Sequence, residues 1–473
     1  MKQASIATYS RLARLLPADL RLVDDAEASR SVTLLTLAAS RRVLPRDIDP
    51  VDVFYREGGA DSLTAGERRT VEDLLAQDKD ALATARAAVA CNDFGIPAVP
   101  AYGATRVSSK MLTAMGAIHD MFCLSAYWSI YQHQHVSAQE SIGDLYRLSG
   151  MFCSAAGDFS LYALGSLGLT KAMGLMNRLL GVCLATIDMK GMELALPRDD
   201  RLVNGYLSAI LSDFLRDIVL TFAELDASIR SPARRKAIPT RMLWAALTRM
   251  RSSMMAAMGH HESPLPRAKT RAIVGAATNS QTVVDLERTL SCLARNYESF
   301  RDAFQRDMGA RMGLENPEAD QSSVWPEELQ LTAQDALVPS RVLVSEAARR
   351  LASIPNALGL LVLRDIVRAV NAAVDRLLAL LWRPLLDLDA TRLMLAVVRF
   401  ERSCGRRPDS AEEALGDGAM FGASVDRLTG VRLKFMPARH VIVGPSFETV
   451  SARIAYLPDA FPLEWPVPQV CSH

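Results

Sequence analysis

Histidine pairs are the first residues in the chain that suggest chemistry, because imidazole nitrogen binds zinc and other divalent metals. His133 and His135 are two residues apart, and His119 precedes them by about four helical turns. On one helix, residues two apart point about 200° away from each other, so we do not expect His133 and His135 to chelate together. A second group, Gly259-His260-His261-Glu262, has the composition of a zinc motif but not its H-E-x-x-H spacing. We interpret it as an exposed helix end.

Acidic pairs are the second candidate. Asp24-Asp25-Ala26-Glu27 and Asp199-Asp200 are similar to acidic metal-diphosphate motifs of helical synthases, but neither has the full pattern. The chain contains no G-x-S-x-G, no Walker A sequence and no G-x-G-x-x-G. Its seven cysteines include no C-x-x-C pair, which favours buried reduced thiols over a zinc knuckle or a disulfide framework. We therefore assign no catalytic, cofactor-binding or metal-binding residue and expect no cofactor.

A basic stretch is the one candidate interaction surface. It could contact phosphate or an acidic protein surface, although a solvated loop and helix face is the interpretation that we favour. Its members are Arg230, Arg234, Arg235, Lys236, Arg241, Arg249 and Arg251.

Composition limits the class of protein. The 473 residues carry 54 Lys plus Arg and 53 Asp plus Glu, so the net charge of +1 gives no overall attraction for nucleic acid. The N-terminal residues have no uninterrupted apolar segment, and residues 354–382 are interrupted by five charged side chains. We therefore expect no signal peptide, no transmembrane span and a cytoplasmic location, with envelope association as the alternative. An unidentified protein partner is expected, and a nucleic acid is not.

Apolar residues spaced three and four apart predict a mainly α fold, a multi-helix bundle or irregular helical array. One helix is expected from Ser108 to Tyr131. A second follows an S-x-x-E capping box at Ser137 and continues to Tyr162, and a third follows Thr170. Pro384 is expected to end a helix that begins near Asn356.

One stripe follows an a/d heptad pattern, and its two phenylalanines favour packing within the chain over a narrow dimeric coiled coil. Its members are Val283, Leu286, Leu290, Leu293, Tyr297, Phe300 and Phe304. We expect these side chains to be buried together.

Five segments follow from changes in composition along the chain. They are an N-terminal helical region at 1–105, a helical bundle at 106–310, a polar linker or long loop at 311–340, helices completing the body at 341–385 and a C-terminal α+β module at 386–473. In the last, residues 431–435 and 439–444 have the alternation of strands, and we expect them to pair antiparallel against a helix ending at Cys404. Residues 450–456 are the expected third strand.

The C-terminal module also carries a motif. Cys404-Gly405-Arg406-Arg407-Pro408-Asp409-Ser410 is followed by Asp426-Arg427-Leu428-Thr429-Gly430 and by Val441-Ile442-Val443-Gly444. Residues 386–446 resemble the globular part of type II secretion major pseudopilins. They also resemble the C-terminus of large uncharacterised helical proteins of planctomycete-like bacteria. The second group is the nearer match, because those proteins also carry a long helical body.

This resemblance implies no catalytic residue. Together with the helical body, it favours a non-catalytic scaffold or protein-interaction component, with a link to the cell envelope or a secretion-type system. The alternative is an all-α enzyme with a ligand pocket between helices, which would need at least two convergent ionisable side chains.

Overall fold

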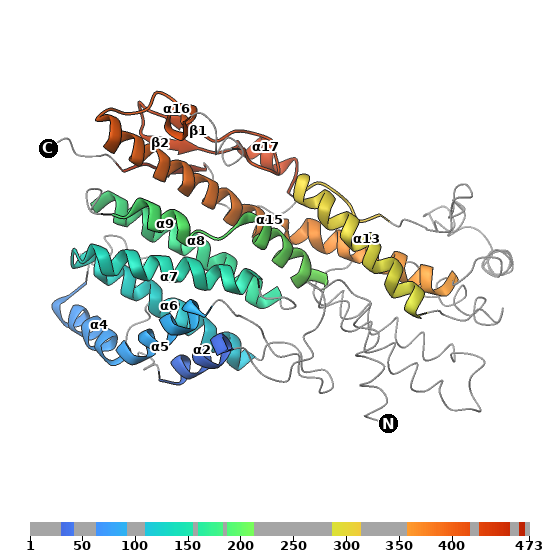
Figure 1. The fold of residues 1–473 in the computed structure, drawn as a ribbon, viewed down its shortest axis with the longest axis horizontal. Coiled ribbons are helices and arrows are strands. Elements are labelled where there is room, and N and C mark those ends of the chain that lie inside the picture. Colours follow the sequence, from blue (N-terminus) through green and yellow to red (C-terminus); the bar gives the residue numbers. More distant parts are fainter. Residues whose placement is uncertain are drawn as a thin grey trace. The chain divides into compact units, whose positions relative to one another are not determined.

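The computed structural model describes residues 30–41, 63–91, 109–154, 159–182, 187–211, 286–313, 357–416, 425–454 and 463–468. The chain divides into two units, each discontinuous in sequence. Unit 1 contains residues 210–306 and 310–376 with the first 22 residues, and unit 2 contains residues 23–209 and 377–473 with 307–309. Helices account for most of the described residues, so the mainly α class is confirmed (Figure 1). The division into five segments stays a prediction.

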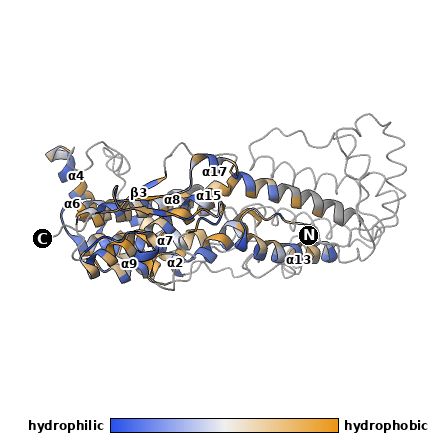
Figure 2. Cartoon of the chain, turned by 90° about the horizontal axis from the view of Figure 1, so that it is seen from above, coloured by the Kyte–Doolittle hydropathy of each residue, from blue (hydrophilic) through white to orange (hydrophobic). Residues whose placement is uncertain are grey.

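The core of unit 2 is built from long helices. α6 (Ser109–Tyr131), α7 (His135–Ser154) and α8 (Phe159–Val182) lie side by side, and α2 (Arg30–Arg41) packs on α5 (Lys79–Ala90) and α6. The short helices α4 (Ala65–Gln77) and α9 (Met189–Ala195) complete this part, and a further helix covers 199–211. These helices carry both hydrophobic and hydrophilic side chains, as expected where one face is buried (Figure 2).

Several of the predicted helix boundaries were wrong, including the start of the third helix after Thr170, because α8 runs through Thr170. α7 begins at His135, so Ser137 lies inside the helix and is not its N-cap. α6 ends in a Schellman-type turn, in which His133 has a φ of 58° and the Gln134 amide donates to the Ser129 carbonyl at 2.8 Å. The predicted second helix continues through Tyr162, but α7 ends at Ser154 and Tyr162 belongs to α8.

Glycines allow α7 to contact its neighbours closely. A Cβ on Gly165 would lie 2.6 Å from the Ser149 carbonyl oxygen, and one on Gly205 would lie 1.7 Å from the Cys153 carbonyl oxygen. Both carbonyls belong to α7, so α8 and the helix at 199–211 approach its backbone where no other residue would fit.

The heptad stripe lies on α13 (Leu286–Arg306) in unit 1. The five members whose side chains are described are buried, with exposed fractions of 3% or less: Leu290, Leu293, Tyr297, Phe300 and Phe304. Val283 and the Leu286 side chain lie outside the described residues. In the same unit, the Asn371 side chain bonds to both the amide and the carbonyl of Met312, at 3.0 and 3.1 Å.

The longest helix contradicts the expectation for Pro384. α15 runs from Ala357 to Cys404 with Pro384 inside it. Proline has no N–H to give to the carbonyl four residues earlier, which is that of Leu380. The Ser166 hydroxyl of α8 donates to this carbonyl at 2.8 Å instead. A side chain from another helix thus supplies the hydrogen bond that proline removes, and α15 continues to Gly405, whose φ is 66°.

The predicted C-terminal hairpin is confirmed. β1 (Lys434–Met436) and β2 (Val441–Val443) pair antiparallel with Phe435 opposite Ile442. The third strand is β3 (Glu464–Pro466), which pairs with β2, and the expected strand at 450–456 was wrong because α17 (Phe447–Ser451) occupies that region. Ser446 caps α17 by accepting from the Thr449 amide, which favours a helix there.

The part of the C-terminal segment that follows α15, hereafter the module, begins with α16 (Ala411–Leu415), whose N-cap is Ser410. The inner face of its sheet consists of Phe435, Ile442 and Trp465, all buried. A two-stranded hairpin alone is marginal in water, so the third strand and the contacts with α15 described below stabilise the sheet.

Candidate functional site

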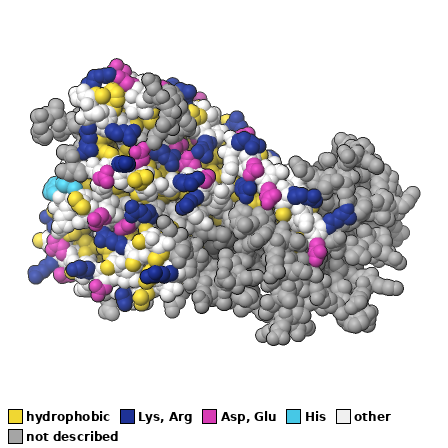
Figure 3. Space-filling model, viewed as in Figure 1, with side chains coloured by type: hydrophobic (Ala, Val, Ile, Leu, Met, Phe, Trp, Pro, Cys, Tyr) yellow, Lys and Arg dark blue, Asp and Glu magenta, His cyan; other side chains and the backbone are white. Residues whose placement is uncertain are grey.

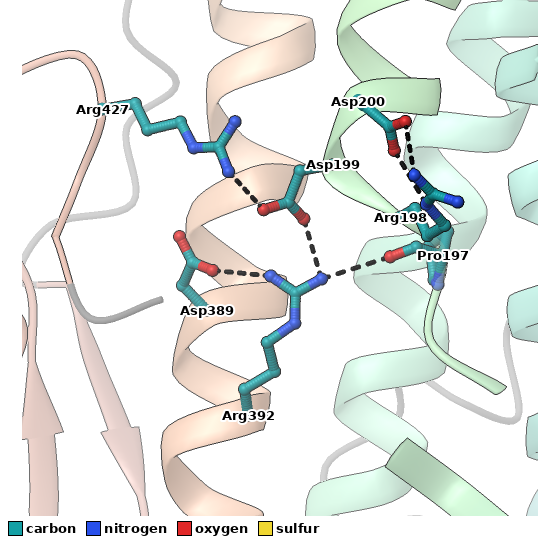
Figure 4. A network of polar contacts seen from close by, with 7 residues as sticks. All are labelled: Pro197, Arg198, Asp199, Asp200, Asp389, Arg392 and Arg427. Carbon is teal, nitrogen blue, oxygen red and sulfur yellow. Dashed lines mark hydrogen bonds and ion pairs between the residues drawn. The ribbon is translucent and has the colours of Figure 1, made fainter. Parts of the chain in front are cut away.

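A largely buried charged site lies where the module meets the helices of unit 2 (Figure 4). Asp389 and Arg392 occupy one turn of α15, Asp199 begins the helix at 199–211, and Arg427 comes from the loop before β1. We call these four residues the junction cluster. The junction cluster is assembled from three segments of the chain that are separated in the sequence.

Arg392 lies between the two carboxylates of the junction cluster. Its guanidinium donates to Asp389 at 2.8 Å, to Asp199 at 2.7 Å and to the Pro197 carbonyl at 3.2 Å. Arg427 donates to the other oxygen of Asp199 at 2.6 Å. The side chains of Asp389, Arg392 and Asp199 are 6%, 14% and 17% exposed, so these ion pairs are shielded from water. Asp199 therefore joins the module to α15.

The electrostatics of the junction cluster are uneven. Burial, together with a smaller effect of the nearby Asp199 carboxylate, raises the pKa of Asp389 to about 7 against the opposing effects of Arg392 and Arg427. Asp389 has one arginine contact, whereas Asp199 has two. Asp389 is thus the member whose charge changes near neutral pH.

Two tryptophans bind buried carboxylates in the same region. The Trp465 indole N–H of β3 donates to Asp387 of α15 at 3.2 Å, and Arg383 donates to the same oxygen at 2.9 Å. In the opposite direction, the Trp382 indole of α15 donates to Asp426 of the module at 2.8 Å. Burial raises the pKa of Asp387, while these donors oppose that rise.

Asp426 also organises its own turn. Its carboxylate accepts from the amides of Leu428 and Thr429 at 3.2 Å, and the Gly430 amide bonds back to its carbonyl at 2.7 Å. Gly430 has a φ of 71°, in the left-handed region that glycine adopts without steric cost. The turn places Arg427 beside Asp199.

A third contact involves Glu401 near the end of α15 and His440 in the turn between β1 and β2. The His440 Nε2 lies 2.9 Å from a Glu401 carboxylate oxygen, and its Nδ1 lies 2.5 Å from the Val467 carbonyl oxygen. Both side chains are about 5% exposed or less. The imidazole therefore connects α15 with the segment that follows β3.

The residues singled out from the sequence lie elsewhere or are differently arranged. His133 and His135 have ring centroids 6.0 Å apart, because His133 lies in the turn before α7 and not on the helix. Within the described ranges, no group of three or more His, Cys, Asp or Glu is placed to hold a metal. Asp199 belongs to the junction cluster, while Asp200 pairs with Arg198 at 2.9 Å.

His119 is buried in the helical core. Its Nε2 lies 3.5 Å from the Ser149 hydroxyl, and its Nδ1 has no hydrogen-bond partner. Burial, with a smaller effect from the Lys171 ammonium, lowers the pKa of His119 to about 3, so the ring is neutral.

The basic stretch from Arg230 to Arg251 lies outside the described residues, as do Asp24-Asp25-Ala26-Glu27 and Gly259 to Glu262. On the face drawn in Figure 3, Lys and Arg side chains are interspersed with Asp and Glu over the described part. The sequence held one signal for the junction cluster, the Asp389–Arg392 pair one helical turn apart.

Comparison with known proteins identified no family model, curated protein or solved structure that matches the chain. Among the helices of the described ranges, none is both long enough and apolar enough to cross a membrane.

Proposed function

We propose that the protein is a non-catalytic scaffold or protein-interaction component whose C-terminal module is the binding part. The observation that carries this proposal is the attachment of the module to the helices of unit 2 by four separate polar contacts. They join Trp382 to Asp426, Trp465 to Asp387, His440 to Glu401 and Arg427 to Asp199. Buried polar contacts of this kind fix geometry more than they add net stability.

A fixed module presents its outer surface in one orientation, which favours binding because less motion is lost on association. Two large apolar side chains of the module are exposed, Met436 at 40% and Phe447 at 54%. Methionine and phenylalanine are enriched in protein interfaces relative to the rest of the surface. The resemblance of residues 386–446 to pseudopilin heads favours a partner in the cell envelope or in a secretion-type system.

Site-specific photo-crosslinking in the source cells tests this proposal. A photoreactive phenylalanine analogue replaces Met436 or Phe447 in the full chain, and Leu194, which is 77% exposed on α9, is the matched control position. We expect one protein to be crosslinked from the module positions and not from position 194, and to fractionate with the envelope. Equal adducts at all three positions would contradict a binding role of the module. A specific adduct that fractionates away from the envelope would contradict the envelope association alone.

An all-α enzyme with a pocket between helices is the second candidate, and His119 favours it. This neutral imidazole, with one nitrogen unpartnered and Ser149 at 3.5 Å, is a polar pair between α6 and α7. Native mass spectrometry of the purified full chain distinguishes the two candidates. A bound small molecule that is lost in His119→Gln would favour the enzyme over the scaffold.

A further inference from the structure

The backbone at His440 is unusual for a histidine. Its φ of 55° lies in the left-handed region, where glycine or asparagine is normally found because a Cβ is disfavoured there. His440 ends the turn in which the Met436 carbonyl accepts from the amides of Arg439 and His440, at 3.1 and 2.8 Å. This conformation places the imidazole in the interior, 4% exposed, and not in solvent.

Hydrogen bonds of the His440 backbone and imidazole offset the energetic cost of this backbone conformation. The Val467 amide donates to the His440 carbonyl at 2.9 Å, and the His440 Nδ1 faces the Val467 carbonyl at 2.5 Å. The ring also contacts Phe435 of β1 edge to face, with centroids 5.8 Å apart. Nε2 faces Glu401 at 2.9 Å. One side chain thus bonds both to α15 and to the segment after β3.

These contacts determine how many protons the Glu401 and His440 side chains must hold together. A carbonyl oxygen only accepts, so Nδ1 must carry a proton to bond Val467. The remaining Nε2–Glu401 contact needs one more proton, held either by Nε2 or by the carboxyl group. Glu401 and His440 must therefore share two protons for both hydrogen bonds to form. With one proton, one of the two bonds is lost.

We propose that the Glu401–His440 pair is a proton-dependent latch that holds residues 463–468 to α15 when the two side chains share two protons. The described charged groups that face the pair are few. Arg407 has its Nε 3.9 Å from the Glu401 carboxylate and is half exposed. The nearby Arg439 side chain is engaged with Glu464 of β3 at 2.8 Å.

Loss of one proton has a local consequence. Without the imidazole bond, Val467 keeps only the bond from its amide to the His440 carbonyl. Because Val467 follows β3, whose pairing with β2 is only three residues long, the attachment of Trp465 weakens as well. This inference does not depend on the proposed protein partner, because it concerns how the module holds its own third strand.

Two variants separate the latch from a general effect of pH. In Glu401→Gln, the amide N–H of glutamine can donate to Nε2 while a neutral imidazole donates from Nδ1, so both contacts persist without the second shared proton. His440→Asn keeps a residue that tolerates positive φ but removes the ring. Hydrogen–deuterium exchange of the full chain is measured at pH 6 and pH 9 and corrected for the intrinsic exchange rate. Protection of residues 463–468 is compared with that of α7 and α8.

We expect protection of residues 463–468 in the wild type to fall about tenfold from pH 6 to pH 9, the effect of one lost hydrogen bond. Glu401→Gln should stay protected at both values, and His440→Asn should be poorly protected at both. Unchanged protection of α7 and α8 shows that each variant folds. The proposal is overturned if the wild type is equally protected at pH 6 and pH 9, or if Glu401→Gln keeps the pH dependence.

Discussion

Replacement of Asp389 by asparagine should stabilise the protein above neutral pH. Asparagine retains a side-chain oxygen that can accept from Arg392, but it carries no charge to be buried beside Asp199. In the wild type, burial raises the pKa of Asp389 from 3.8 to about 7. A carboxyl group whose pKa is raised in the folded state destabilises the fold at every pH where the unfolded chain has lost more of its protons, so the effect begins near pH 4, grows with pH and is complete above pH 7.

The magnitude follows from the difference between the two pKa values. About three pH units at about 1.4 kcal/mol each give about 4 kcal/mol in the free energy of unfolding. This figure is an upper limit, because Arg392 and Arg427 can rearrange around the ionised carboxylate. The side chain is 6% exposed, so screening by solvent reduces it little.

Urea unfolding followed by tryptophan fluorescence at pH 5, 6, 7 and 8 measures the effect, since Trp382 and Trp465 report on unit 2. The free energy of Asp389→Asn minus that of the wild type should rise by up to about 3 kcal/mol between pH 5 and pH 7, and then level off by pH 8. Asp409→Asn is the matched control, because the Asp409 side chain is 94% exposed and its replacement should give no pH-dependent difference. A difference that is the same at pH 5 and pH 8, or a variant less stable than wild type at pH 8, would refute the reasoning.

Three further substitutions test the packing by chemical unfolding. Ser166→Ala should cost about 1 kcal/mol by leaving a part-buried carbonyl of α15 without its donor, and this cost should shrink in a Pro384→Ala background, where the backbone N–H returns. Gly205→Ala should cost more than about 4 kcal/mol because its Cβ would lie 1.7 Å from a backbone oxygen, whereas Gly181→Ala, with open space around it, should be neutral or stabilising. Phe300→Ala should cost about 3–5 kcal/mol, and a cost below about 1 kcal/mol would mean that the stripe of α13 is not a core.

The sequence predicts the helices of this protein better than their ends. The stripe from Leu290 to Phe304 is periodic, and periodicity depends only on which face is buried. The continuation of α15 through Pro384 depends instead on a hydroxyl from α8, 214 residues away from its acceptor. No local pattern around Pro384 contains that information.

The same limit applies to the junction cluster. The Asp389–Arg392 spacing is visible in the sequence, but the approach of Asp199 and Arg427, 228 residues apart, is a result of tertiary folding. Strand prediction shows a related limit: residues 431–435 and 439–444 have the alternation of strands, whereas β3, which is as short as β1 and β2, includes a proline. So short a segment becomes a strand because β2 offers it an edge.

The polar attachments of the module also set an order for protein synthesis. Asp387 and Glu401 are made before the residues that bond them, because Trp465 comes 78 residues after Asp387 and His440 comes 39 residues after Glu401. Until those residues leave the ribosome, the nascent helix carries carboxylates with no indole and no imidazole partner, and such chains are the ones that chaperones retain and proteases degrade. A polypeptide ending before residue 463 should therefore be turned over faster than the full chain, even though α6, α7 and α8 are already present in it.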